Sequence, residues 1–259
     1  MKILDVNTNL DWKVKILPIF TDNYVFLIQQ NTTNHVIVVD PGEAEGVKNF
    51  LTKNSLKLTS IILTHHHQDH IGGVAALKDD YPAAKIYAPL KNKNEIPDAD
   101  FYVQQGQSLV IENLTFEVLE LPGHTLGHLA YWCKEQNWLF SGDVLFGLGC
   151  GRLFEGTFSQ MFESLKAIKS LPQSTNIFCT HEYTETNLRF CDQIIQQQSE
   201  FLIPQDQLKS YAADLRQKRN QGLPSVPLSL ATELKTNPFL RASTVEQFTE
   251  VRSRRNSFK

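Results

Sequence analysis

The feature that most constrains this chain is the segment Thr64 to His70, where four histidines and one aspartate follow directly on an apolar run. Such a run predicts a buried strand, so the ligand-type residues begin where that strand ends. Side chains alternate along extended backbone, which lets His65 and His67 face the same side. Asp69 and His70 are expected to open the next helix and to face a second metal ion. A surface histidine run or a tag remnant is the alternative, but a tag lies at a terminus and would not carry the aspartate.

Three later segments repeat this architecture, each a β-rich apolar run that ends in a ligand-type residue: Val118 to His124, Trp138 to Asp143 and Asn176 to His181. Strand ends on one rim of a sandwich can converge on a single site. Taken singly, each terminal residue is more often a loop residue bonded to backbone, but together with the first segment they predict one centre. Five imidazoles and two carboxylates suit two borderline divalent metal ions better than calcium. The candidate ligands are His65, His67, Asp69, His70, His124, Asp143 and His181.

Two other histidines near these segments are not expected to bind metal. His66 falls out of phase with its two neighbours on extended backbone. His128 follows His124 by four residues, which would fit a helical pair of ligands, but the intervening sequence and Pro122 disfavour a helix. His128 is therefore expected to support the site by packing or hydrogen bonding.

The order of the periodic segments predicts an α+β chain with two parts. We expect residues 1–181 to form a catalytic domain of mixed strands and helices, and residues 182–259 to form a smaller, all-helical, substrate-binding domain. Strands are expected at 14–18, 24–28, 36–39, 60–63, 85–87, 116–119, 129–132, 138–140 and 176–179. Helices are expected at 158–168, with Thr157 and Gln160 as a capping box, and at 184–198, 205–221 and 244–255, the last with Ser243 and Glu246 as a capping box.

Composition excludes several classes of function. A net charge of -3 over 259 residues argues against a nucleic-acid or anionic-membrane partner. No stretch approaches the roughly 20 apolar residues of a spanning helix, and the first residues do not form a signal core. Cysteines 133, 150, 179 and 191 are widely spaced, which disfavours a disulfide scaffold and a structural zinc cage. We therefore expect a monomer in a reducing, cytoplasmic compartment.

Several motifs resemble one family along essentially the whole chain. The metal motif matches the HxHxDH signature of the metallo-β-lactamase superfamily, and the other motifs are most similar to the glyoxalase II family, the hydroxyacylglutathione hydrolases. Those motifs are PIFTDNY at 18–24, PGHT at 122–125, GCGRLFEGT at 149–157, THEYT at 180–184 and NPFLR at 237–241, together with an Arg-rich end that closes on Phe258. The resemblance implies a metallo-β-lactamase-type αββα sandwich followed by the smaller all-α domain.

The resemblance also implies roles for individual residues. His65, His67 and His124 would hold the first metal ion, Asp69, His70 and His181 the second, and Asp143 would bridge both. Glutathione would be gripped by Arg152, Tyr183, Arg252 and Arg255. Phe154 stands where many eukaryotic members carry Tyr, so this chain lacks that hydroxyl. From the sequence alone, basic residues such as Arg252 and Arg255 near a helix C-terminus also complement the helix dipole.

Together these features predict a thioester hydrolase. As the resemblance implies, a hydroxide bridging the two metal ions, with Asp69 and Asp143 beside it, would attack the thioester of S-D-lactoylglutathione or a related S-2-hydroxyacylglutathione. The products would be D-lactate, or another 2-hydroxy acid, and glutathione. Zinc is the expected metal, with iron and manganese as alternatives. The rival hypotheses are a lactonase or β-lactamase-like hydrolase on the same metals, a persulfide-oxidising relative with a single iron, and a non-catalytic, metal-stabilised binding module.

Overall fold

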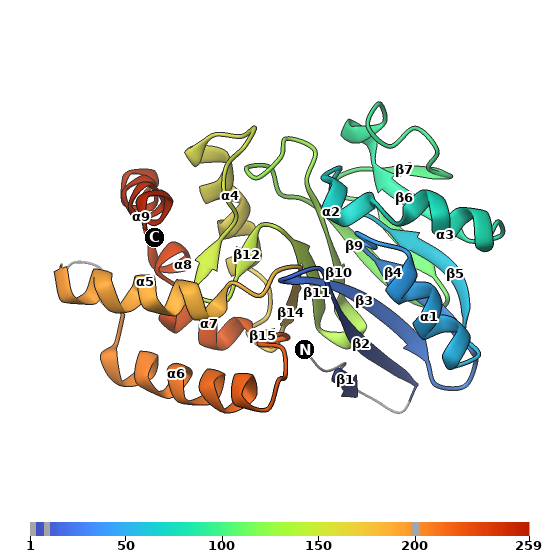
Figure 1. Ribbon diagram of the computed structural model, residues 1–259. Helices are drawn as coiled ribbons and strands as arrows, with labels where there is room; N and C mark the ends of the chain where they lie inside the picture. Colours follow the sequence, from blue (N-terminus) through green and yellow to red (C-terminus); the bar gives the residue numbers. More distant parts are fainter. Residues whose placement is uncertain (1–3, 8–10, 198–202, 259) are drawn as a thin grey trace.

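The computed structural model describes residues 4–7, 11–197 and 203–258. Two mixed sheets stack face to face, with helices on both outer sides (Figure 1). The first sheet runs in sequence order through β1 (Leu4–Asn7), β2 (Trp12–Ile19), β3 (Asn23–Gln30), β4 (His35–Val39), β5 (Lys57–Ile62), β6 (Lys85–Pro89) and β7 (Phe101–Val103). Its first four strands are antiparallel, and β4 to β7 are parallel. The predicted αββα sandwich is confirmed.

The second sheet has the spatial order β15-β14-β11-β10-β9-β8. Its strands are β8 (Ser108–Ile111), β9 (Leu114–Glu120), β10 (Leu129–Cys133), β11 (Trp138–Gly142), β14 (Asn176–Cys179) and β15 (Leu228–Ser229). A separate short hairpin, β12 (Leu145–Phe146) with β13 (Gly149–Cys150), follows β11. All nine strands expected from the sequence are present. The short strands β1, β7, β8, β12, β13 and β15 were not predicted, because two to four residues carry too little periodicity.

Strand β3 shows why the sequence folds into layers. Its residues alternate between two cores: Phe26 and Ile28 face the second sheet, while Val25 and Leu27 face the outer helices. Helices α1 (Glu45–Lys53) and α3 (Val74–Asp80) cover that outer face (Figure 1). Burial on both faces accounts for the nearly continuous apolar run in this strand.

On the other side of the sandwich, α4 (Phe158–Lys169) packs with the C-terminal helices against the same central core. The predicted capping box of Thr157 and Gln160 is present at its start. The helices after β14 are α5 (Thr184–Gln197), α6 (Gln205–Asn220), α7 (Leu230–Thr236), α8 (Pro238–Arg241) and α9 (Val245–Ser257). No helix in the described part of the chain combines the length and apolar character that crossing a membrane requires.

The C-terminal part is helical, as expected, apart from the two-residue strand β15, which pairs antiparallel with β14 and covers backbone groups that would otherwise form an open edge. One expectation about this part is wrong: the last helix is capped one residue later than expected. Thr244 has the extended backbone of an N-cap and accepts from Gln247 N, so Thr244 and Gln247 take the places assigned to Ser243 and Glu246.

Candidate metal centre

Loops at one rim of the sandwich bring all seven predicted ligands together. His65 follows β5, and His67 precedes the short helix α2 (Gln68–Ile71), which carries Asp69 and His70. The other three ligands follow β9, β11 and β14 in sequence, and an isolated bridge from Asn23 to His181 ties the end of β14 to the start of β3. Strand ends far apart in the sequence therefore meet, as the repeated pattern predicted.

Three imidazoles form the first group. The Nδ1 atom of His67 lies 3.0 Å from Nε2 of His65 and 3.0 Å from Nε2 of His124. Burial lowers the pKa of His65 well below its usual range, and it also lowers the pKa values of His67 and His124. Neutral imidazoles keep a lone pair on one nitrogen, which is the form that binds metal ions.

Asp69, His70 and His181 form the second group, with ligand atoms within 4.8 Å of one another. Nε2 of His181 lies 3.4 Å from Oδ2 of Asp69, and Nε2 of His70 lies 3.5 Å from the same oxygen. The His70 Nε2 atom is buried and has no hydrogen-bond partner among the described residues. An orphaned buried nitrogen that faces a carboxylate fits a bound cation.

Asp143 lies between the two groups. Its Oδ2 atom is 3.3 Å from Nε2 of His124 in the first group and 3.3 Å from Nε2 of His181 in the second. Burial by itself would raise the pKa of this carboxyl, but the charges of His181 and His70 outweigh burial and hold it well below its usual range. A buried carboxylate shared by two nitrogen-rich groups has the position of a bridging ligand. The His/Asp cluster in this fold therefore supports a dinuclear divalent metal site.

A further set of polar groups orients the ligands, and the sequence did not reveal it. Asp40 accepts from Thr64 N and Oγ1 at 2.8 and 2.7 Å, and its Oδ2 lies 3.1 Å from His70 Nδ1. Asp22 Oδ1 lies 3.3 Å from Nδ1 of His181. The pattern used for the predicted ligands, an apolar strand that ends in a ligand-type residue, also fits Asp40, which directly follows β4.

Other contacts fix the remaining ligands. The Arg152 carbonyl lies 2.7 Å from His124 Nδ1. Asn23 donates to Asp69 Oδ2 at 2.9 Å, and Thr180 donates to Asp143 Oδ1 at 2.5 Å. Partners of this kind set the direction and tautomer of a metal ligand.

Two of the three remaining histidines, His66 and His128, lie near the site. His128 is fully buried, stacks on His65 and accepts a hydrogen bond from Asp143 N through Nε2 at 3.0 Å. His66 makes its shortest polar contacts with Asn92 and Glu155, at 2.9 and 3.3 Å, and a nitrogen of its ring also lies within 4.8 Å of one in His67. His128 thus supports a ligand, and His66 lies outside both groups.

A cavity of about 560 Å³ opens beside the metal centre and contains all four predicted glutathione-binding residues. Tyr183 stacks on the ring of His181 with centroids 4.8 Å apart. Arg252 and Arg255 reach the same cavity from α9, and Arg152 enters from the loop after β13. The sequence did not predict several other residues that line it, namely Phe146, Cys150, Asn187, Asn256 and Phe258.

The two α9 arginines differ in environment. Arg252 is only 5% exposed and donates through Nη1 to the Cys150 carbonyl at 2.8 Å. Arg255 is half-buried and donates through Nε to Asn187 Oδ1 at 3.0 Å, while its guanidinium lies over the rings of Phe190 and Phe258. Arg252 therefore supports the β12–β13 hairpin in addition to lining the cavity.

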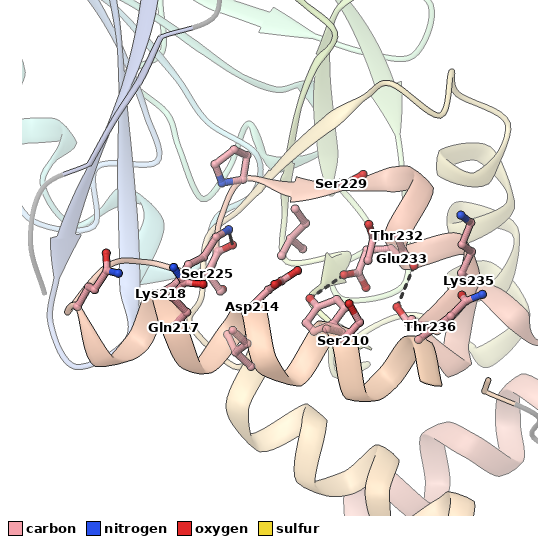
Figure 2. A pocket seen from close by; sticks show the side chains of 16 residues that line it. Ser210, Asp214, Gln217, Lys218, Ser225, Ser229, Thr232, Glu233, Lys235 and Thr236 are labelled. Carbon is pink, nitrogen blue, oxygen red and sulfur yellow. Dashed lines mark hydrogen bonds between the residues drawn. The ribbon is translucent and has the colours of Figure 1, made fainter. Parts of the chain in front are cut away.

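A second cavity of about 710 Å³ lies between α6 and the segment that contains β15 and α7 (Figure 2). None of the predicted site residues lines it. Glu233 is buried in its wall, accepts from Tyr211 at 2.8 Å, and accepts from Leu148 N at 2.9 Å. Burial raises the pKa of Glu233 to about 7. Through Leu148, this carboxyl connects the helical part to the β12–β13 hairpin beside the metal centre.

Comparisons with known proteins agree with this geometry. Residues 19–181 match the model of the metallo-beta-lactamase superfamily, and residues 182–258 match that of the hydroxyacylglutathione hydrolase C-terminus. A hydroxyacylglutathione hydrolase of Bdellovibrio bacteriovorus is 53% identical over 94% of this chain and 97% of its own length. One from Photobacterium profundum is 44% identical over 88% and 86%.

Solved structures share the fold. A B3 metallo-beta-lactamase, BLEG-1, superposes with a TM-score of 0.67 at 24% identity, covering 88% of this chain and 100% of its own. ETHE1 from Myxococcus xanthus gives 0.69 at 23% identity, covering 98% and 90%. At these identities, the two solved structures show only that the fold is shared. The sequence matches extend through both parts of the chain. The chain therefore belongs to the hydroxyacylglutathione hydrolases, the glyoxalase II family of the metallo-beta-lactamase superfamily.

Proposed function

We propose that this chain hydrolyses the thioester of S-D-lactoylglutathione and of related S-2-hydroxyacylglutathiones. Water adds to the acyl carbon, the carbon–sulfur bond breaks, and a 2-hydroxy acid and glutathione are released. The observation that carries the proposal is that one cavity joins the His/Asp cluster to arginine side chains from α9. A substrate with a reactive carbonyl at one end and carboxylates at the other matches that arrangement.

For the metal ligands, we propose that His65, His67 and His124 hold one ion, that Asp69, His70 and His181 hold the other, and that Asp143 is shared. When bound, two divalent ions lower the pKa of water and stabilise the charge that develops on a carbonyl oxygen. Zinc fits the mixture of imidazole and carboxylate ligands, as do iron and manganese. All seven positions are occupied by ligand-type residues, which favours an enzyme over a binding module that only uses metal for stability.

The catalytic role is assigned to the two carboxylates, Asp69 and Asp143. Burial would raise the pKa of Asp69, but its hydrogen bond with His181, the charge of His70 and the Asn23 amide lower it instead. Asp143 is held by Thr180 at Oδ1 and by His128 at its backbone N–H. These contacts fix both carboxylates in direction, which reduces the reorganisation needed during the reaction.

The thiol leaving group requires little acid catalysis from the chain. A thiol of the cysteine type has a pKa of about 8.5, so the thiolate departs without the strong general acid that an amine would need. The chain's remaining task is to hold glutathione, and we assign this to Arg152, Tyr183, Arg252 and Arg255. The guanidinium of Arg152 lies 5.6 Å from the centre of the Phe154 ring. Phe154 has no hydroxyl, so it contacts Arg152 through the face of its ring.

A lactonase or β-lactamase-like activity remains the competing enzyme hypothesis, because it could use the same metal ligands. It would have less use for a cavity wall that carries three arginines. A persulfide-oxidising activity with a single iron differs in metal stoichiometry from the two ligand groups seen here. The cytoplasmic location and the monomeric state expected from the sequence stay predictions.

Hydrolysis of S-D-lactoylglutathione, followed by the ultraviolet absorbance of the thioester, tests the proposal when metal content is measured on the same sample. We expect turnover together with two metal ions per chain. A β-lactam, a lactone and a thioester without the glutathione carboxylates serve as comparison substrates. Faster turnover of any of these than of lactoylglutathione, or one iron per chain with persulfide oxidation, would contradict the proposal.

A further inference from the structure

The turn between β2 and β3 belongs to the PIFTDNY motif, which the assigned metal and glutathione roles leave unused. Two of its residues touch the second ligand group: Asp22 lies 3.3 Å from His181 Nδ1, and Asn23 donates to Asp69 Oδ2. The turn is therefore attached to the metal centre at two points, and any side chain that it projects has a defined place beside the reacting atoms.

Phe20 is the large apolar side chain that this turn projects. It is 62% exposed, and its backbone has φ 49°. A bulky residue in this left-handed region is strained, and exposing an aromatic ring to water forgoes the gain from burying it. Neither feature helps the fold, so the position of the ring calls for an explanation in terms of a ligand.

The ring of Phe20 stands at the Asp69 edge of the metal centre. Its Cε2 atom lies 3.0 Å from the point that a Cβ on Gly42 would occupy, and that point is 2.0 Å from the Asp69 carbonyl oxygen. Asp69 lines the 560 Å³ cavity, whereas Phe20 does not. Phe20 therefore marks the rim of the site just outside the cavity.

This placement follows the shape of a glutathione thioester. In the glutathione orientation proposed above, the tripeptide would lie toward α9, where the arginines are, and the acyl group would lie on the other side of the carbonyl. Phe20 is an exposed apolar side chain close to Asp69, and the Asp22 and Asn23 contacts anchor its turn there.

We propose that Phe20 is a specificity residue that contacts the acyl group and favours 2-hydroxyacyl groups with apolar or aromatic side chains. The inference rests on the proposed thioester hydrolase function and adds the acyl preference to it. An aromatic acyl group would cover the exposed ring and remove apolar surface from water. A lactoyl group, which carries only a methyl, would gain much less from the same contact.

The experiment compares S-D-mandeloylglutathione, which carries a phenyl ring, with S-D-lactoylglutathione. Phe20→Ala should lower kcat/KM for the mandeloyl substrate about tenfold, which corresponds to about 1.4 kcal/mol, and lower that for the lactoyl substrate no more than about twofold. Phe20→Leu keeps apolar bulk and should fall between the parent and Phe20→Ala. Phe101→Ala is the matched control, because Phe101 is a 47% exposed ring on β7 outside the site. It should leave the ratio of the two substrates unchanged.

Equal losses on both substrates would show that Phe20 only maintains the turn or the metal ligands, and no loss on either would also overturn the inference. Metal content and circular dichroism of each variant check the centre and the fold. Binding of a non-hydrolysable glutathione thioether with a benzyl-type group, measured calorimetrically, adds a readout without turnover. If the parent hydrolyses neither substrate, the proposed function fails, and this binding comparison alone decides whether Phe20 contacts the group on sulfur.

Discussion

Replacing Arg255 with Ala tests glutathione recognition at a half-buried side chain of the cavity wall. In the described part of the chain, Arg255 makes a hydrogen bond through Nε, to Asn187, and none through its two terminal nitrogens, which are available to a carboxylate in the cavity. A hydrogen bond to a charged group contributes about 1.5–3 kcal/mol. Because Arg255 is only half-buried, solvent reduces that value, and we expect a loss of about 1–2 kcal/mol.

A loss of one to two kcal/mol corresponds to about a 5- to 30-fold rise in KM for S-D-lactoylglutathione. The guanidinium would bind the tripeptide equally before and during the reaction, so kcat should hardly change. The assay is steady-state hydrolysis followed by thioester absorbance, with a small thioester that lacks both glutathione carboxylates as the second substrate. Arg255→Ala should leave the turnover of that second substrate almost unchanged.

Two neighbouring arginines provide the controls. Arg254 lies on the same helix but pairs with Glu250 at 2.7 Å and does not line the cavity, so Arg254→Ala should leave KM unchanged. Arg252→Ala should raise KM and also lower the free energy of unfolding by about 1–3 kcal/mol, because the Cys150 carbonyl loses its buried donor. A fall confined to kcat in Arg255→Ala, or an equal effect in Arg254→Ala, would refute the assignment.

Three further predictions follow from the site and its supports. Asp143→Ala should lose the paired-metal state, while His66→Ala should keep two metal ions per chain by elemental analysis; two ions and near-normal turnover in the first variant would show the bridging assignment to be wrong. Gly151→Ala should lower the urea midpoint by the equivalent of about 1–3 kcal/mol, since its Cβ would lie 1.9 Å from the backbone oxygen of Asp143; an unchanged midpoint would contradict this. Glu233 has a folded pKa of about 7 against an ordinary value of 4.5, so its contribution is fully present below about pH 4.5 and is lost as the pH rises through 7. Glu233→Gln should therefore gain stability relative to the parent over that window, by up to the order of 3 kcal/mol in chemical denaturation, whereas parallel pH curves would argue against it.

The residues proposed as metal ligands could be picked out of the sequence because each stands in a recognisable local pattern. His65 and His67 sit two residues apart directly after an apolar strand, and the other segments repeat the same order of strand followed by ligand. Alternation on extended backbone is a short-range property, so it also separated His66 from its neighbours correctly. The long strands were equally readable, because buried positions recur along them with a fixed period.

The sequence was less informative where a feature depends on a partner distant along the chain. Nothing near Asp22 in the sequence signals that its carboxylate meets His181, 159 residues away, and β15 exists because β14 offers it an edge. The N-cap of α9 is a second feature that the sequence did not predict correctly. Ser243 and Thr244 are equivalent N-cap residues by type, and the choice between them depends on which register buries Phe248 and Val251 in the core.

The sequence alone was enough to pick out the proposed ligands, the layered strands and the family, because these depend on local order and on long motifs. Only the tertiary structure shows which of two similar residues is buried in the fold and which stays partly exposed. Arg252 and Arg255 are three positions apart and look alike in the sequence, yet one is buried against the Cys150 carbonyl and the other turns half-exposed toward Asn187. The tertiary structure likewise left Phe20 exposed at the metal centre. Burial and hydrogen bonding are properties of the packed chain, and identical residue types acquire different roles only when the whole fold has formed around them.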